Sequence, residues 1–135
     1  METATVRYLG ELRTEARHTR SGEVILTDAP PDNKGRGEAF SPTDLMSTSL
    51  AVCMITVMGI AAREKNIPFN GVTARVVKHM HAAPRRVSAV EVHLEMDGNG
   101  LGERERAILE RTAHTCPVAL SLHPDLEQRI TFSYR

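Results

Sequence analysis

The chain contains two cysteines, Cys53 and Cys116, and their sulfur atoms are the most reactive groups in the sequence. Two cysteines are too few for a disulfide framework or for a zinc site made of thiolates alone. Two thiols that meet in a fold can still act as an attacking and a resolving thiol, because a sulfenic acid on one sulfur condenses with the other. These two residues therefore direct attention to thiol redox chemistry.

The two cysteines stand in different local sequences. Cys53 lies near the middle of a long uncharged segment, where a cysteine typically packs as a small, inert hydrophobe. Cys116 directly precedes Pro117, a residue type that favours the first position of a helix. The partial positive charge at a helix start stabilises a thiolate. Local electrostatics alone therefore favour Cys116 as the nucleophile.

One acid and two arginines are candidates to complete a thiol site. Asp44 follows Ser41 by three residues, the spacing of a capping box, which is its simpler role. Asp44 also precedes Cys53 by about two and a half helical turns, so the two side chains lie on roughly opposite sides of one helix. A guanidinium could bridge them, since it can hold a carboxylate on one side and a thiolate on the other. The candidate arginines are Arg36, in the loop before the helix, and Arg13, in the N-terminal strands.

The six histidines leave a metal-binding alternative open. His79 and His81 share one face of a predicted strand, and His114 lies two residues before Cys116. No HExxH or CxxC motif accompanies these histidines. His79 and His81 fall on a polar strand face, where exposure to solvent is enough to explain their presence. The chain also lacks a GxSxG elbow and a Gly-rich phosphate loop. We therefore expect no metal and no other cofactor.

Composition excludes several classes of partner. The 17 basic and 17 acidic side chains of this 135-residue chain cancel, whereas nucleic acid binding needs a basic surplus. The sequence does not begin with the basic stretch and following apolar stretch of a signal peptide. We therefore expect a cytoplasmic protein with reduced thiols. Residues 45–62 carry no formal charge, and this length is at the lower limit for a membrane span. We interpret the segment as the core helix of a soluble domain, with no membrane partner.

The elements that must position these groups follow the order βββ-α-ββ-αα-β. That order is typical of an α+β fold with a mostly antiparallel sheet, and the length is that of a single domain. Alternating apolar residues, turn signals, a Ser-Pro-x-Asp helix start and proline stops set the element boundaries. The predicted elements are N-terminal strands in 1–30, a central helix over 41–66, a hairpin over 71–97, helices over 103–122 and a last strand over 128–135.

Two segments are distinctive as motifs. They are Ser41-Pro42-Thr43-Asp44-Leu45 leading to Ala51-Val52-Cys53, and Cys116-Pro117-Val118-Ala119-Leu120 leading to the closing strand Ile130-Thr131-Phe132-Ser133-Tyr134. Both resemble the OsmC/Ohr family, and within it the YhfA-like branch. The similarity covers essentially the whole chain in order. It implies a single OsmC-like domain in which an antiparallel sheet wraps around long central helices of an intertwined homodimer. The active site would lie at the subunit interface.

The resemblance also implies a thiol peroxidase that acts in oxidative-stress defence. Cys53 would be the peroxidatic thiol, activated by a nearby arginine, and Cys116 the resolving thiol. These roles are the reverse of those favoured by the electrostatics of the helix start, which make Cys116 the nucleophile. The substrate would be an alkyl or lipid hydroperoxide, and an external dithiol would reduce the resulting disulfide.

The sequence departs from the best-understood branch of that family at one position. There, a glutamate ten residues before the first cysteine anchors the catalytic arginine; here that position is Thr43, and Asp44 follows it. Arg13 matches the N-terminal region of the family and Arg36 matches the loop before the helix. The alternative function is therefore a non-enzymatic, dimeric small-molecule-binding protein with little peroxidase turnover.

Overall fold

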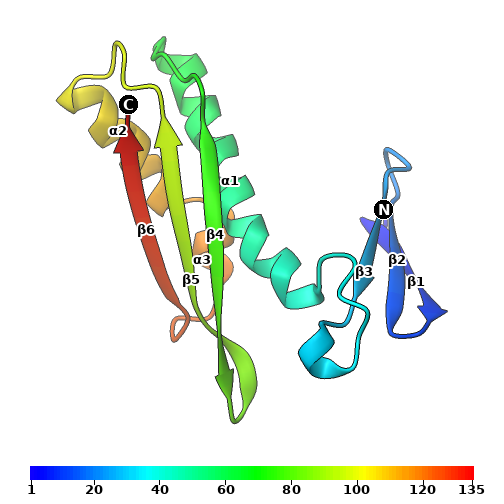
Figure 1. The fold of residues 1–135 in the computed structure, drawn as a ribbon. Helices are drawn as coiled ribbons and strands as arrows, with labels where there is room; N and C mark the ends of the chain where they lie inside the picture. The colour runs from blue at the N-terminus through cyan, green and yellow to red at the C-terminus, as the bar shows by residue number, and fades with distance from the viewer. The chain divides into compact units, whose positions relative to one another are not determined.

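The structure, a computed structural model, describes residues 1–135 and divides into two compact units, Met1–Met46 and Ser47–Arg135. Each unit contains one three-stranded sheet (Figure 1). The order of helices and strands is the predicted one, with the addition of a short 3-10 turn at Pro31–Asn33. The α+β class is confirmed.

The first unit contains a meander of antiparallel strands. These are β1 (Ala4–Gly10), β2 (Arg13–His18) and β3 (Val24–Asp28). Val6, Ala16 and Ile25 lie side by side across the three strands, so they share one face of the sheet, and Tyr8 is on that face too. Val6 and Tyr8 are 67% and 65% exposed. This sheet therefore has an apolar face that is left uncovered.

The second unit packs helices on one face of its sheet (Figure 1). Its elements are α1 (Pro42–Lys65, which begins in the first unit), β4 (Thr73–Ala82), β5 (Arg85–Met96), α2 (Glu103–His114), α3 (Pro117–Ser121) and β6 (Glu127–Tyr134). β4 and β5 form the predicted antiparallel hairpin, while β6 runs parallel to β5. The chain returns to the sheet edge through α2 and α3, which makes that parallel pairing possible.

The core of the second unit lies between β5 and the buried faces of α1 and α2. On β5 the alternating apolar residues are all fully buried: Val90, Val92, Leu94 and Met96. On α1 the buried residues recur at helical spacing: Leu50, Met54 and Met58. Strand and helix periodicities therefore place two complementary apolar surfaces against each other.

α1 begins at the predicted capping box. The Ser41 backbone N–H donates to the Asp44 carboxylate at 3.0 Å, and the Asp44 backbone N–H donates to Ser41 Oγ at 3.1 Å. Pro42 occupies the first helical position, where its missing N–H costs nothing. Arg63 and Lys65 lie in the last turn, where cations complement the helix dipole.

α1 also carries an apolar stripe that the chain does not bury. By length and composition alone the helix could cross a membrane, since an 18-residue window has a mean hydropathy of 2.0; only 33% of that window is buried. The core helix of a soluble protein has the same character. On the exposed stripe, Val52 and Ile60 are 58% and 52% exposed.

Candidate functional site

The fold places the two thiols next to each other in the second unit. Cys53 comes from the middle of α1 and Cys116 from the residue before α3, and both are free thiols. Cys53 packs against the buried cluster to which Cys116 belongs, and the two thiols are close enough for Cys53 to shift the pKa of Cys116. Residues that are 63 positions apart in the sequence thus form one dithiol site.

Cys116 caps α3 as its sequence predicts. The backbone N–H of Ala119 donates to Cys116 Sγ at 3.4 Å. The cysteine is only 1% exposed, in the buried cluster that also contains Leu109 and Ala113. The thiol is therefore closed off from solvent although it stands at a helix start.

Burial raises the pKa of the Cys116 thiol above its usual range. The Ala119 N–H acts in the opposite direction, but the hydrogen bond with Cys53 and repulsion between the two sulfur charges add to the rise. Burial thus outweighs the helix-end effect that favoured Cys116 as the nucleophile. A Cys116 that keeps its proton can donate it toward the sulfur of Cys53.

Cys53 is the more accessible of the two sulfur-bearing residues. It is half-buried, on the side of α1 that packs against the core, whereas Cys116 is buried. A reagent from solvent therefore meets Cys53 before Cys116. This difference in access applies to peroxide and to reductant alike.

Arg13 is held by a carboxylate within the first unit. Its Nε donates to Asp28 Oδ1 at 2.7 Å and its Nη2 donates to Asp28 Oδ2 at 2.8 Å. The Asp28 side chain is fully buried, and the Glu38 backbone N–H donates to it at 3.1 Å. The hydrogen bonds from Arg13 hold the pKa of Asp28 below its usual range, and Asp28 in turn raises the pKa of Arg13.

The second candidate arginine lies near the same carboxylate. The charge of Arg36 contributes to the lowered pKa of Asp28. Both predicted arginines therefore gather around Asp28, a residue that the sequence interpretation did not single out. The register of the hairpin, whose strands are joined after the His18–Glu23 backbone hydrogen bond, sets Arg13 opposite Asp28.

The predicted site residues thus fall into separate groups. Cys53 and Cys116 form the dithiol of the second unit, and Arg13 and Arg36 accompany Asp28 in the first unit. Asp44 fills its simpler predicted role as the cap of α1.

The histidines do not converge on a metal site. His79 hydrogen-bonds to Glu91, and His93 Nε2 hydrogen-bonds to the other oxygen of the same carboxylate at 2.9 Å. His81 lies instead against the backbone oxygen of Pro84 at 3.3 Å, so the two histidines of the predicted pair have different partners. No group of three or more His, Cys, Asp or Glu side chains is arranged to hold a metal ion.

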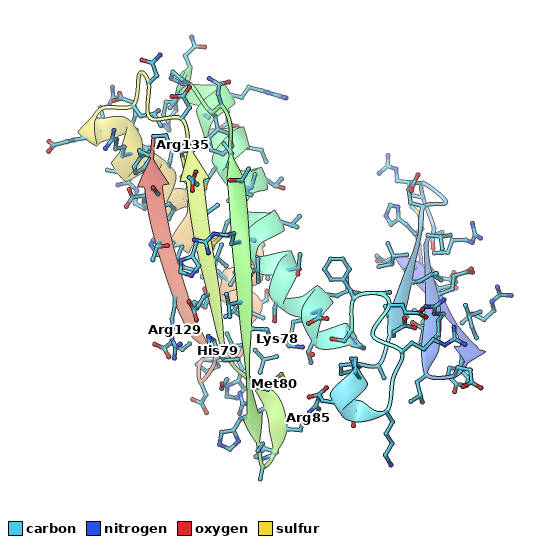
Figure 2. All side chains as sticks on the ribbon, viewed as in Figure 1. Lys78, His79, Met80, Arg85, Arg129 and Arg135 are labelled. Carbon is cyan, nitrogen blue, oxygen red and sulfur yellow. The ribbon has the colours of Figure 1, made fainter.

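The cluster around Glu91 lies instead on the outer face of the sheet. Arg129 of β6 reaches Glu91 at 3.9 Å and Glu127 at 2.8 Å, and Figure 2 labels Arg129 and His79 on the two outer strands of this sheet. The hydrogen bonds from His79 and His93 hold the pKa of Glu91 below its usual range. These contacts form an ion network of partly exposed side chains.

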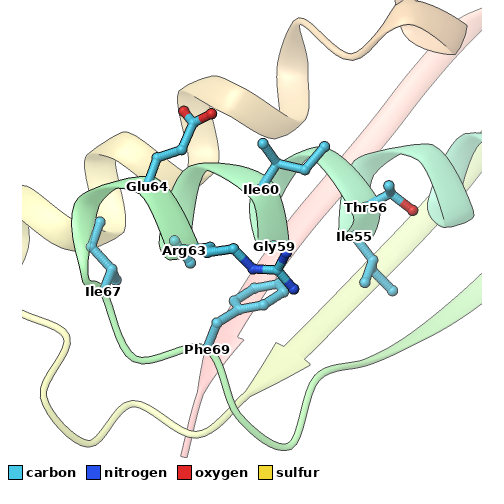
Figure 3. A pocket seen from close by; sticks show the side chains of 9 residues that line it. Ile55, Thr56, Gly59, Ile60, Arg63, Glu64, Ile67 and Phe69 are labelled. Atoms are coloured by element: carbon cyan, nitrogen blue, oxygen red, sulfur yellow. The ribbon is translucent and has the colours of Figure 1, made fainter.

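A groove of about 690 Å³ runs along the second half of α1 (Figure 3). Its lining combines apolar residues of α1 with Ile67 and Phe69 of the following loop, and it includes the charged Arg63 and Glu64. Thr56 and Ile60, which line it, lie about one and two turns beyond Cys53 on the same helix. The groove therefore continues the unburied stripe of α1.

Comparison with known proteins identifies relatives along nearly the whole chain. A structure from Psychrobacter arcticus 273-4, of a protein proposed to take part in osmotic stress and detoxification responses, shares 51% identity with a TM-score of 0.93 and covers 98% of this chain and 96% of that one. An organic hydroperoxide resistance protein OsmC from Legionella pneumophila has 20% identity, a TM-score of 0.76 and 98% coverage of both chains. An organic hydroperoxide resistance protein from Elizabethkingia anophelis has 18% identity, a TM-score of 0.73 and coverage of 100% and 98%.

The two hydroperoxide resistance proteins share the fold with this chain. No curated protein sequence matches it. Assignment to the YhfA-like branch and the single-domain description of 1–135 stay predictions. The model of the OsmC-like protein family matches residues 35–130. Together with the relative that is 51% identical, this match shows that the chain belongs to the OsmC-like protein family.

Proposed function

We propose that this protein is a thiol-dependent peroxidase that reduces alkyl or lipid hydroperoxides in oxidative-stress defence. The observation that carries the proposal is the adjacency of the Cys53 and Cys116 thiols. Membership of the OsmC-like family supports it, and two relatives of the same fold are organic hydroperoxide resistance proteins. We place the reaction in the cytoplasm, where both thiols stay reduced between turnovers.

The proposed cycle uses the two thiols in sequence. The Cys53 thiolate attacks one oxygen of the hydroperoxide, the O–O bond breaks, and the alcohol leaves after taking up a proton. Cys53 is then a sulfenic acid. Cys116 gives up its proton and attacks the Cys53 sulfur, and the departing hydroxide leaves as water. The resulting disulfide is reduced by an external dithiol, which restores both thiols.

We assign the activating arginine to Arg13. Its guanidinium is oriented by two hydrogen bonds to a buried carboxylate, so its position is fixed before a peroxide arrives. Such a guanidinium stabilises a thiolate and the charge that develops on the departing oxygen. Asp28 then supplies the anchoring carboxylate that position 43, a threonine, lacks. Arg36 adds positive charge near the same acid, and Asp44 fixes the start of the helix that carries Cys53.

We further propose that the protein is a homodimer. The chain leaves two apolar surfaces uncovered: the stripe of α1 with Val52 and Ile60, and the face of the first sheet with Val6 and Tyr8. A soluble protein rarely leaves such surfaces without a partner. A second copy suits them, because the chain has no net charge and two copies do not repel each other. The groove along α1 belongs to this surface.

The test is consumption of cumene hydroperoxide by the purified protein with dihydrolipoamide as the dithiol. Cys53→Ser is expected to lose all turnover. Cys116→Ser is expected to reduce one equivalent and to stop with a sulfenic acid on Cys53 that dimedone traps. An active Cys53→Ser protein contradicts the assignment of the two roles. Wild-type protein that forms no Cys53–Cys116 disulfide with stoichiometric peroxide indicates the non-enzymatic binding function instead.

A further inference from the structure

We infer that the reducing dithiol attacks the sulfur of Cys53, and that Cys116 is the thiol released when the disulfide opens. The inference rests on the proposed function, since it concerns the second half of the same cycle. It specifies which sulfur forms the mixed disulfide with the reductant. Neither the family membership nor the fold of the relatives specifies it.

Access to the two sulfurs is the first argument. Thiol–disulfide exchange requires the attacking sulfur to reach one disulfide sulfur from the side opposite the leaving sulfur. Cys116 is 1% exposed, within the same buried cluster as Leu109, Ala113 and Ala119. A reductant would have to displace part of this core to reach it. Cys53 is half-buried on α1, so less of the core covers it than covers Cys116, and a reductant reaches it with less displacement of packed side chains.

The surroundings of the leaving sulfur are the second argument. The Ala119 N–H points at Cys116 Sγ, at 3.4 Å, and can continue to donate when that sulfur departs as a thiolate. The surrounding apolar core disfavours the same thiolate, which by itself slows its departure, and protonation then holds the released sulfur as a thiol. The hydrogen bond from Ala119 therefore supports Cys116 as the leaving group, while burial keeps the reductant from attacking its sulfur.

The bonds and electrons of the step balance. A thiolate of the dithiol forms a bond to Cys53 Sγ, the Cys53–Cys116 bond breaks, and its electron pair goes to Cys116 Sγ, which is then protonated. The second thiol of the reductant, as a thiolate, attacks the sulfur of the reductant in the mixed disulfide. Cys53 leaves as the thiolate, and the reductant leaves as a cyclic disulfide. The enzyme gains two electrons and regains the state that attacks peroxide.

The experiment traps the mixed disulfide with a monothiol, which cannot complete the second exchange. The disulfide form of the wild-type protein is prepared and exposed briefly to glutathione, and iodoacetamide then blocks every free thiol. Peptide mass spectrometry locates the two labels, and the ratio is extrapolated to zero exposure time to remove later exchange. We expect glutathione on Cys53 and the carbamidomethyl group on Cys116. The reverse pattern, or equal labelling of both cysteines, overturns the inference.

The same protein in guanidinium chloride is the matched control. Unfolding exposes both sulfurs, so the site preference is expected to disappear while the chemistry stays the same. A preference that persists in denaturant would come from the local sequence and would also overturn the inference.

Failure of the inference and failure of the proposed function remain distinguishable. If cumene hydroperoxide produces no disulfide, the proposed peroxidase fails. The disulfide can then be formed with diamide, and the site of glutathione attack still tests the inference by itself.

Discussion

Arg13 and Asp28 stand directly opposite each other on β2 and β3, joined by two parallel hydrogen bonds of 2.7 and 2.8 Å. A planar guanidinium held at two points by a buried carboxylate has little freedom to turn. The Arg13–Asp28 pair therefore holds the part of the guanidinium that does not bind Asp28 in a fixed direction. Position 43 of the helix is a threonine, and the acid that orients Arg13 comes from a strand.

Acid is expected to remove the contribution of this pair to stability. Since the pKa of Asp28 is lowered in the fold, the unfolded chain binds the proton at a higher pH than the folded chain does. The contribution is present above the unfolded pKa, about 4, and is lost as the pH falls through the folded value. Melting curves recorded from neutral to acidic pH should show a steeper loss below about pH 4 in wild type than in Asp28→Asn.

Asp125→Asn is the control for that comparison, because Asp125 is an exposed acid. It should keep the wild-type pH profile. Equal acid sensitivity of wild type and Asp28→Asn would contradict the role assigned to the pair. Asp28→Asn should also melt at a lower temperature at neutral pH, since Arg13 loses its ionic partner.

The thiol of Cys116 is expected to resist alkylation until the pH is well above the ordinary value of about 8.5. Burial is the largest cause of its raised pKa, and Cys53 adds to it. Cys53→Ala should therefore lower the apparent pKa of Cys116 only in part. The measurement is the rate of carbamidomethylation of Cys116 against pH, followed by peptide mass spectrometry. An ordinary thiol pKa in the wild-type protein would show that burial does not control this sulfur.

A charge on the exposed stripe of α1 is expected to break the proposed homodimer. Ile60→Arg places a guanidinium where a second copy would cover an apolar side chain, and the dimer should weaken by about tenfold or more, or 1.4 kcal/mol. Light scattering coupled to gel filtration gives the mass directly. Val77→Arg, on the outward face of β4, is the matched control and should remain dimeric. A wild-type monomer at all concentrations would refute the assembly itself.

Tyr134→Phe is expected to destabilise the second unit by about 1.5 kcal/mol. The Tyr134 hydroxyl donates to Glu110 at 2.6 Å, so it ties β6 to α2 through a charged acceptor. The ring also supports the Arg106 guanidinium at 4.3 Å, and phenylalanine keeps that contact. Denaturant unfolding measures the change. Ser133→Ala changes an exposed neighbour and should stay within about 0.5 kcal/mol of wild type. A Tyr134→Phe protein as stable as wild type would show that the Tyr134–Glu110 hydrogen bond does not stabilise the fold.

Local patterns predicted the parts of the fold that depend on nearby residues. The Ser41–Asp44 spacing located the start of α1, and Cys116-Pro117 located the cap of α3. Alternating apolar residues located β5. In each case the signal lies within a few neighbouring residues, so a short stretch of sequence contains it.

Distant partners were harder to predict. Nothing local to β6 shows that it runs parallel to β5, because the direction depends on where α2 and α3 return the chain. The raised pKa of Cys116 results from tertiary burial, which outweighs the local helix end. The Asp28 partner of Arg13 needed the register of a hairpin, whereas the sequence interpretation looked for an acid on the helix.

The uncovered apolar face of the first sheet has a consequence for how the protein persists in a cell. A three-stranded sheet that displays Val6 and Tyr8 to water cannot draw its full stability from its own chain. In the proposed homodimer, a second copy that covers this face stabilises it in proportion to the logarithm of the protein concentration. Dilution is then expected to act on this protein as a mild denaturant.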